Sequence, residues 1–204
     1  IFKKEINYMK INNKTGYYKG LEIHSAPFVH EKVFDMIVSL NISKDSKVLI
    51  LGSGTGSFDS RILDAGYTNI YSVDYSDAYK FKDKVTFLQR DLNNDFSDIG
   101  TDFDLIICIE IIEHLENQAH FLRNISSLLN KEGKVIITSP NVENTYSRIK
   151  FLFLGFLSYF NKNDLKGEMI HINPVLEHIF LYNSEKSNLT LIEKTFNKNV
   201  YIAQ

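Results

Sequence analysis

The sequence has little cysteine and no long uninterrupted hydrophobic run. Its one cysteine, Cys108, excludes an internal disulfide framework and is typical of the reducing cytoplasm. The longest apolar stretch, residues 149–160, is interrupted by Lys150, Gly155 and Ser158, and it falls short of the roughly 20 residues that a membrane-spanning helix needs. No secretory signal peptide is visible. We therefore expect a cytoplasmic protein without a transmembrane segment.

A strong excess of charge of one sign is also missing. The net charge of −2 gives the chain no general attraction to nucleic acid or to anionic membranes. The sequence also lacks an obvious stripe of Lys and Arg with interleaved aromatic residues, which binding to a phosphate backbone would favour. Nucleic acid is therefore an unexpected partner. The length of 204 residues and the apolar fraction of 44% instead predict a single globular domain, 1–204, with a sizeable core.

The most informative feature that is present is a glycine-rich turn directly after an apolar run. Residues 48–58 read Val-Leu-Ile-Leu-Gly-Ser-Gly-Thr-Gly-Ser-Phe. The four apolar residues predict a buried parallel strand, and glycine both tolerates positive φ and lets a ligand approach the backbone closely. A second expected strand, 69–73, ends at Asp74, from where a carboxylate can bind the two ribose hydroxyls of a nucleoside. The pattern predicts a site for a nucleoside-containing cofactor.

The spacing of the glycines indicates which cofactor. In the dinucleotide fingerprint G-x-G-x-x-G, the third glycine would stand at Ser57, but here Gly52, Gly54 and Gly56 give G-x-G-x-G. With the acid that follows, residues 48–58 resemble the first motif of the Rossmann-like S-adenosylmethionine (SAM) methyltransferases. A nicotinamide enzyme and a glycine turn without a ligand are the alternatives.

Strand-type and helix-type segments alternate along the chain, which predicts an α/β fold with a parallel sheet covered by helices on both faces. Near the C-terminus, residues 189–196 alternate in polarity and precede a second short apolar run, which predicts an antiparallel hairpin. The resemblance implies a Rossmann-like, doubly wound, mostly parallel seven-stranded sheet that this hairpin completes. We expect strands at 47–51, 69–73, 85–89, 103–109, 134–138, 189–196 and 200–203, and helices at 28–40, 58–65 and 117–129, with Gly133 as the C-cap of the last helix.

In such a sheet the ligand lies over the carboxyl ends of the strands. The resemblance implies that Asp91 accepts a hydrogen bond from the adenine amine and that residues 108–110 lie at the methionine end. The alternative for Asp91 is a carboxylate that caps its own loop. The predicted cofactor-binding residues are Gly52, Ser53, Gly54, Gly56, Asp74, Tyr75, Asp91, Leu92, Ile109 and Glu110.

Glu110, Glu113 and His114 follow the fourth expected strand with the spacing E-x-x-E-H. On a helical turn, residues three or four apart share a face, so two carboxylates and an imidazole, joined by His171, would form a site for a divalent cation such as Mg²⁺. Such an ion would lower the pKa of a substrate hydroxyl. Residues 103–117 resemble the corresponding segment of the ubiquinone-biosynthesis O-methyltransferases, in which this pattern is a metal site. If no metal binds, His114 is the candidate general base, and we predict His114 and Glu113 as the catalytic residues.

Two segments outside the sheet are expected to close the site. We interpret residues 1–45 as an N-terminal helical cap, in which His24 and His30 stand where relatives close the cofactor pocket. Residues 141–182 are interpreted as an insertion or lid on the acceptor side, with many aromatic residues between 148 and 160. These could form a wall for an aromatic, lipid-like or glycan-linked acceptor, or touch a membrane surface. The alternative is packing on the sheet or on a second subunit of a homodimer.

Together these patterns indicate a SAM-dependent methyltransferase that methylates a hydroxyl of a small molecule. The Asn/Asp-Pro-Pro-Tyr motif typical of enzymes that methylate amide or adenine nitrogens is absent after the fourth expected strand. One alternative is a metal-dependent RNA 2′-O-methyltransferase, because the small-RNA 3′-end enzymes share the E-x-x-E-H pattern. The other is a SAM-binding regulatory or scaffold domain of a larger protein, which a first residue other than Met leaves open.

Overall fold

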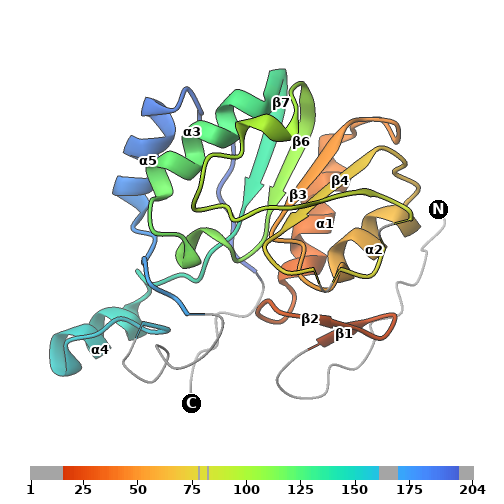
Figure 1. The fold of residues 1–204 in the computed structure, drawn as a ribbon. Helices are drawn as coiled ribbons and strands as arrows, with labels where there is room; N and C mark the ends of the chain where they lie inside the picture. Colours follow the sequence, from red (N-terminus) through yellow and green to blue (C-terminus); the bar gives the residue numbers. More distant parts are fainter. Residues whose placement is uncertain (1–15, 78, 82, 161–169, 198–204) are drawn as a thin grey trace, which may run out of the picture.

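A five-stranded sheet, in which all neighbouring strands are parallel, forms the centre of the computed structural model (Figure 1), which describes residues 16–77, 79–81, 83–160 and 170–197. The strand order is β5-β4-β3-β6-β7. The chain winds from the central strand first to one edge and then to the other, so the switch point lies between β3 and β6. The strands are β3 (Val48–Leu51), β4 (Ile70–Asp74), β5 (Thr86–Gln89), β6 (Phe103–Cys108) and β7 (Leu129–Ile137).

Helices cover both faces of the sheet because its central strand is apolar on both. Successive side chains of a strand point to opposite faces. Accordingly, Val48 and Ile50 of β3 belong to the core under α1 (Val29–Leu40) and α2 (Ser57–Asp64). Leu49 and Leu51 belong to the core under α3 (Gln118–Leu128) and α5 (Glu177–Lys186). The predicted doubly wound α/β fold is confirmed, and so are the parallel strands.

The predicted helix at 117–129 is present, but its predicted end is wrong. The helix begins after Asn117, whose side chain accepts a hydrogen bond from the His120 backbone N–H at 2.9 Å. It ends at Leu128, and β7 starts at the next residue. Gly133 therefore lies inside β7 instead of capping the helix. A Cβ at this position would lie 2.7 Å from the carbonyl oxygen of Phe103, so the close approach of β6 requires the glycine.

The expected C-terminal hairpin does not form a strand pair in the described part of the chain. Residues 189–196 are not assigned to any strand, and the expected partner at 200–203 lies outside the described residues. A strand is defined by a ladder of backbone hydrogen bonds to a neighbouring strand, and no ladder is assigned to residues 189–196 within the described ranges. The seven-stranded sheet is therefore not confirmed, and five parallel strands are what the structure supports.

The described part of the predicted N-terminal cap contains a β-hairpin that the sequence did not reveal. β1 (Gly16–Tyr18) and β2 (Leu21–Ile23) pair antiparallel through a two-residue turn, in which Lys19 and Gly20 have φ of 50° and 80°. Asp64 at the end of α2 accepts hydrogen bonds from the Tyr18 hydroxyl at 2.8 Å and from the Lys19 ammonium at 2.7 Å. These contacts hold the hairpin against α2. Residues 1–15 of the predicted cap lie outside the described ranges.

The expected acceptor-side insertion carries α4 (Thr145–Leu154), which leaves the body of the molecule at the lower left of Figure 1. Asn144 caps its N-terminus by accepting a hydrogen bond from the Ser147 backbone N–H at 2.9 Å. Within the described ranges, no helix has both the length and the apolar character needed to cross a bilayer. Two short 3-10 turns, η1 (Ser97–Ile99) and η2 (Ile112–His114), complete the described elements.

Candidate active site

A cavity of about 690 Å³ lies at the carboxyl ends of β3, β4, β5 and β6. This is the size range of sites for small molecules and cofactors, and its position is where sheets of this type bind ligands. All the predicted cofactor-binding residues except Gly56 line it: Gly52, Ser53, Gly54, Asp74, Tyr75, Asp91, Leu92, Ile109 and Glu110. The structure thus gathers residues from four strand ends around one space.

The three glycines after β3 all have positive φ, but the space beside them differs. The φ values are 76° at Gly52, 53° at Gly54 and 82° at Gly56. A Cβ at Gly52 would lie 2.9 Å from the Ile111 side chain, and one at Gly56 would lie 2.8 Å from Phe81. These two glycines therefore allow close packing of the protein on itself. Only Gly54 has open space beside it, with the nearest atom, Nδ1 of His24, 3.7 Å from a built Cβ.

Asp74, at the end of β4, fixes the glycine turn. Its carboxylate is buried, and one oxygen accepts a hydrogen bond from the Gly54 backbone N–H at 2.7 Å. The other oxygen accepts from the Ser76 backbone N–H at 2.9 Å. Because each carboxylate oxygen can accept more than one hydrogen bond, the predicted bonds to ribose hydroxyls are compatible with these contacts. The ribose role stays a prediction.

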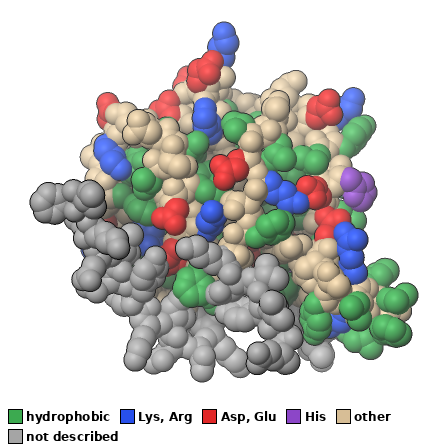
Figure 2. All heavy atoms as spheres, turned by 180° about the vertical axis from the view of Figure 1, so that it is seen from behind, with side chains coloured by type: hydrophobic (Ala, Val, Ile, Leu, Met, Phe, Trp, Pro, Cys, Tyr) green, Lys and Arg blue, Asp and Glu red, His purple; other side chains and the backbone are tan. Residues whose placement is uncertain are grey.

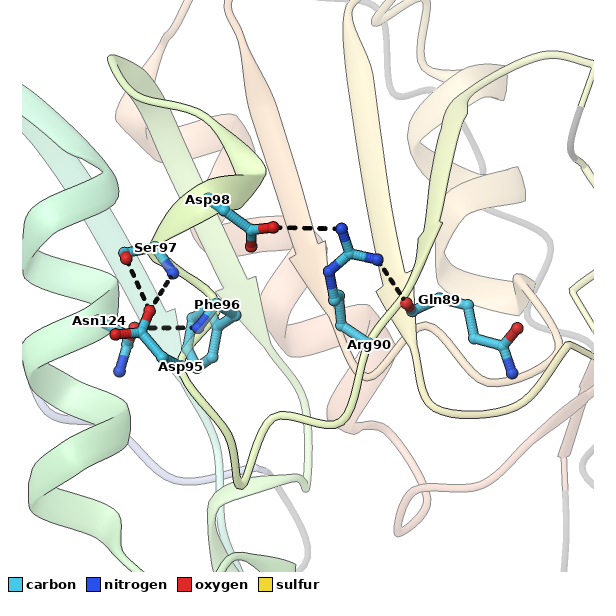
Figure 3. Close-up of polar contacts among 7 residues, drawn as sticks. All are labelled: Gln89, Arg90, Asp95, Phe96, Ser97, Asp98 and Asn124. Atoms are coloured by element: carbon cyan, nitrogen blue, oxygen red, sulfur yellow. Dashed lines mark hydrogen bonds and ion pairs between the residues drawn. The ribbon is translucent and has the colours of Figure 1, made fainter.

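Hydrogen bonds hold the loop after β5 near its start and near its end (Figure 3). Arg90 donates to its neighbour's carbonyl, that of Gln89, at 2.9 Å and to the Asp98 carboxylate at 3.2 Å. Farther along, the backbone N–H of Phe96 donates to the side chain of Asn124 in α3 at 3.2 Å. These bonds hold the loop between the sheet and α3, which positions the intervening residues beside the cavity.

Asp91 has the geometry of a carboxylate that caps its own loop, which was the alternative to the predicted contact with adenine. One carboxylate oxygen accepts a hydrogen bond from the Asn93 backbone N–H at 2.9 Å, and the other accepts from the Asn94 side chain at 3.3 Å. The residue is exposed and caps its own loop, while Leu92 is buried in the core. Because Asp91 also lines the cavity, contact with adenine is compatible with this geometry and stays a prediction.

The N-terminal segment contributes to the cavity lining both the two histidines singled out in the sequence and two residues that sequence patterns did not single out. Glu22 and Ser25 line the cavity beside His24 and His30. The Glu22 backbone carbonyl accepts a hydrogen bond from the Thr55 hydroxyl at 2.8 Å, which joins the segment to the glycine turn. Three-residue strands carry too little periodicity for a sequence pattern to have placed Glu22 there.

His30 is a buried polar side chain that lines the cavity. Burial, helped by the positive charge of Arg61, lowers the pKa of His30 to about 3, so the imidazole is neutral. Its Nδ1 atom has no hydrogen-bond partner among the described residues. A buried polar atom without a partner is costly, so a ligand that bonds to this nitrogen would recover that cost.

At the end of β6, Glu110 adopts an unusual backbone conformation. Its φ is 49°, which is uncommon for a residue other than glycine and is often found at functional sites. Its backbone N–H donates to the Thr138 hydroxyl oxygen at 3.0 Å, and that hydroxyl donates to the Glu110 carboxylate at 2.9 Å. Burial raises the pKa of Glu110, and the Thr138 hydroxyl partly offsets this effect.

Three of the four predicted metal ligands come together next to this position. Ligand atoms of Glu113, His114 and His171 all lie within 4.8 Å of one another. Glu110 is not in this group, and its carboxylate instead accepts a hydrogen bond from the Thr138 hydroxyl. Glu113 is fully buried, and neither of its carboxylate oxygens has a hydrogen-bond partner among the described residues. Burial and the nearby Glu110 carboxyl both raise the pKa of Glu113, and the Ser139 hydroxyl, which lies nearby without forming a hydrogen bond of good geometry, partly offsets this effect.

The segment 170–173 is bonded directly to the E-x-x-E-H turn. The backbone N–H groups of Ile172 and Asn173 both donate to the Glu113 carbonyl at 3.0 Å. Nδ1 of His114 lies 2.9 Å from the Ile170 carbonyl oxygen. Since a carbonyl only accepts, Nδ1 carries the proton and Nε2 is the unprotonated nitrogen of the neutral ring. Burial lowers the pKa of His114, which favours this neutral form.

The chain matches the model of a methyltransferase-domain family over residues 27–187. The ubiquinone biosynthesis O-methyltransferase of Rickettsia felis is 30% identical over 157 residues, which cover 69% of this chain and 62% of that protein. The Rickettsia bellii protein of the same name is 30% identical over 115 residues, which cover 50% of this chain and 45% of that one. The chain therefore spans only about half of the length of the curated relatives it matches.

Two solved structures illustrate the likeness in fold. A SAM-dependent methyltransferase from Archaeoglobus fulgidus gives a TM-score of 0.59 at 20% identity, over 78% of this chain and 67% of that one. The YcgJ protein of Bacillus subtilis gives 0.60 at 16% identity, over 78% of this chain and 68% of that one. At these identities the likeness shows the fold alone. With the family match over most of the chain, the cavity and the glycine turn, the protein belongs to the class I SAM-dependent methyltransferases.

Proposed function

We propose that the protein transfers the methyl group of SAM to a hydroxyl of a small molecule. The observation that carries this proposal is the group formed by Glu113, His114 and His171 beside the cofactor cavity. It offers an unprotonated imidazole nitrogen where β6 ends, which is what removal of a hydroxyl proton requires, and a buried carboxyl lies beside it. Two curated relatives named as O-methyltransferases support the same reaction.

On the cofactor side, we assign binding to the glycine turn, Asp74 and the loop after β5. Gly54 leaves room for the cofactor, and Asp74 accepts hydrogen bonds from the ribose. Bound SAM supplies a methyl group on a positively charged sulfur, a good leaving group, so the protein has to align the acceptor, remove its proton and exclude water. The buried position of the cavity's inner residues serves the last of these tasks.

In the metal-free form of the proposal, His114 is the general base. Its Nε2 atom accepts the proton of the acceptor hydroxyl, while the Ile170 carbonyl holds the Nδ1–H group and fixes the ring orientation. Because burial lowers the pKa of His114, the ring is neutral and ready to accept a proton near neutral pH. The imidazole of His171, whose ring centroid lies 4.7 Å from that of His114, borders the same space.

The same residues fit a divalent cation. The buried carboxyl of Glu113 without a hydrogen-bond partner is what a cation would stabilise, and two imidazoles stand within reach. Glu113, His114 and His171 would hold the ion. Two nitrogen donors and one carboxylate suit a transition-metal dication better than Mg²⁺, which prefers oxygen ligands. When bound, such an ion lowers the pKa of a coordinated hydroxyl.

A methyl-transfer assay with a panel of phenols, sugars and lipid-linked alcohols tests the proposal, with an RNA 3′ end included as an acceptor. His114→Asn and Glu113→Gln should abolish turnover but leave S-adenosylhomocysteine (SAH) binding within a few-fold. His178→Asn, in α5 at an exposed position, is the matched control. Full turnover by both site variants would refute the proposal, and activity on RNA alone would favour the RNA 2′-O-methyltransferase instead.

Chelation separates the two forms of the mechanism. Loss of turnover with EDTA and its recovery with Mn²⁺ or Zn²⁺ would establish the metal, whereas indifference to EDTA would leave His114 as the base. SAH binding without turnover on any acceptor would support a SAM-binding regulatory or scaffold domain. A cytoplasmic location is part of the proposal, supported by the buried, unpaired thiol of Cys108.

A further inference from the structure

The apolar side chains in the C-terminal half of α4 are exposed. Leu152 is 75% exposed and Phe153 is 77% exposed, and Ile149, Phe151 and Leu154 are each more than half exposed. Figure 2 shows hydrophobic side chains gathered at the lower right, the region of α4 in that view. Contiguous exposed apolar surface of this kind marks a site of contact with a partner or a membrane.

The exposed residues surround the helix instead of forming one face. Consecutive residues of an α-helix are separated by about 100° around its axis, so residues 151–154 together cover its whole circumference. A rigid partner, including a second copy of the chain, covers one side of a helix and leaves the rest in water. A fluid hydrocarbon phase encloses the end of a helix on all sides, which makes a bilayer the better occupant.

The charge around α4 favours a bilayer with anionic lipids. The sequence has no acidic residue between Glu143 and Asp164, whereas Arg148 and Lys150 lie in the helix. The ammonium of Lys150 lies 5.8 Å from the ring centroid of Tyr146 and 5.1 Å from that of Phe156, at the base of the apolar end. Aromatic and basic residues in this position are typical of the boundary between hydrocarbon and headgroups.

The aromatic residues that follow α4 also contact the candidate active site. The ring of His171 lies 5.4 Å from the ring of Phe160 and 6.5 Å from that of Tyr159, centroid to centroid. Residues 159 and 160, which follow α4 in the chain, therefore contact the group that contains Glu113 and His114. The overall charge of −2 plays no part in this attraction, which comes from the local excess of basic residues.

We propose that the end of α4 inserts into the surface of an anionic lipid bilayer. The helix is too short to span one, so the contact is superficial and reversible, with residues 151–154 among the acyl chains and Arg148 and Lys150 among the headgroups. Because residues 159 and 160 after α4 contact His171, a hydroxyl carried by a lipid becomes a candidate acceptor; this last consequence alone rests on the proposed function.

Sedimentation with vesicles tests the proposal without any acceptor or turnover. The wild type should bind vesicles of phosphatidylcholine and phosphatidylglycerol at least tenfold better than vesicles of phosphatidylcholine alone. The double variant Leu152→Ser, Phe153→Ser should lose more than tenfold in binding, and Lys150→Gln should lose about fivefold. Ile192→Ser is the matched control, since Ile192 is 78% exposed but lies outside α4.

Because the substituted side chains are exposed, the variants should fold, and unchanged SAH binding checks this. Failure of the wild type to bind anionic vesicles overturns the proposal, as does undiminished binding by the double variant. If the wild type is instead a dimer that the double variant dissociates, the occupant of α4 is a second copy. Methyl transfer is not measured, so this result is independent of the proposed reaction.

Discussion

Replacing Asp74 by alanine should cause two losses that can be measured separately. The first is structural, because the carboxylate accepts hydrogen bonds from the backbone N–H groups of Gly54 at 2.7 Å and Ser76 at 2.9 Å. These bonds hold the glycine turn in the ligand-free protein. The second is the predicted pair of hydrogen bonds to the cofactor ribose, which exists only when the cofactor is bound.

The magnitudes follow from the burial of Asp74, a residue that is only 7% exposed. A hydrogen bond to a charged group contributes about 1.5–3 kcal/mol, but the freed N–H groups regain water in the open cavity. We therefore expect the free energy of unfolding of the ligand-free protein to fall by about 1–3 kcal/mol. Loss of the ribose contacts should weaken SAH binding by a further 1–3 kcal/mol or so, which is roughly 5- to 150-fold in affinity.

Urea unfolding without ligand and calorimetric titration with SAH measure the two effects. Asp74→Asn keeps the size of the side chain and one acceptor oxygen. Its free energy of unfolding and its SAH affinity should both fall between those of the wild type and of the alanine variant. Asp45→Ala, at a carboxylate exposed outside the cavity lining, is the control and should leave SAH affinity unchanged. If Asp74→Ala lowers stability but leaves SAH affinity intact, the ribose role is refuted and Asp74 is only a support for the turn.

Three further substitutions have expected outcomes. Gly54→Val should abolish SAH binding in a folded protein, because a branched side chain at φ 53° is strained and fills the open space; calorimetric heat would contradict this. Burial raises the pKa of Asp59 from 3.8 to about 6, so the folded state binds the proton more tightly and stability falls by about 3 kcal/mol as pH rises through that range. Asp59→Asn should remove this slope in urea unfolding, and an unchanged slope would show that other groups cause it. The pKa of His30 is lowered from 6.5 to about 3, so stability falls as pH falls through that range, and His30→Phe should resist acid unfolding better than the wild type. Equal loss of stability at low pH in both proteins would contradict this.

The central sheet was predictable because its strands are short apolar runs that are buried on both faces. Val48 to Leu51 show this pattern, and the glycine turn that follows them fixes the strand's end. Gly133 was misread because a glycine after Lys-Glu at the end of a helix is typical of a C-cap, while the contact that requires it here is with Phe103, 30 residues earlier. Sequence patterns predict local conformation better than they predict contacts between residues that are far apart in the sequence.

Within the candidate site, residues that are close together in the sequence were easier to predict than residues that come together only in the folded structure. Glu113 and His114 lie together because they are adjacent in η2. Glu110 has the motif's spacing but not its geometry, because its positive φ turns it toward Thr138, which no spacing rule indicates. Glu22 and Ser25 reach the cavity through a hairpin of three-residue strands, whose pairing depends on packing against α2.

The hydrogen bonds from Ile172 and Asn173 to the Glu113 carbonyl have a consequence for how such enzymes diversify. They anchor the chain where it returns to the site, just as β7 anchors it where it departs. For a flexible loop whose two ends are held in this way, doubling the length costs only about 0.6 kcal/mol in closure entropy. Insertions of quite different size and polarity can therefore be exchanged there at small cost, while the sheet and the glycine turn keep their geometry.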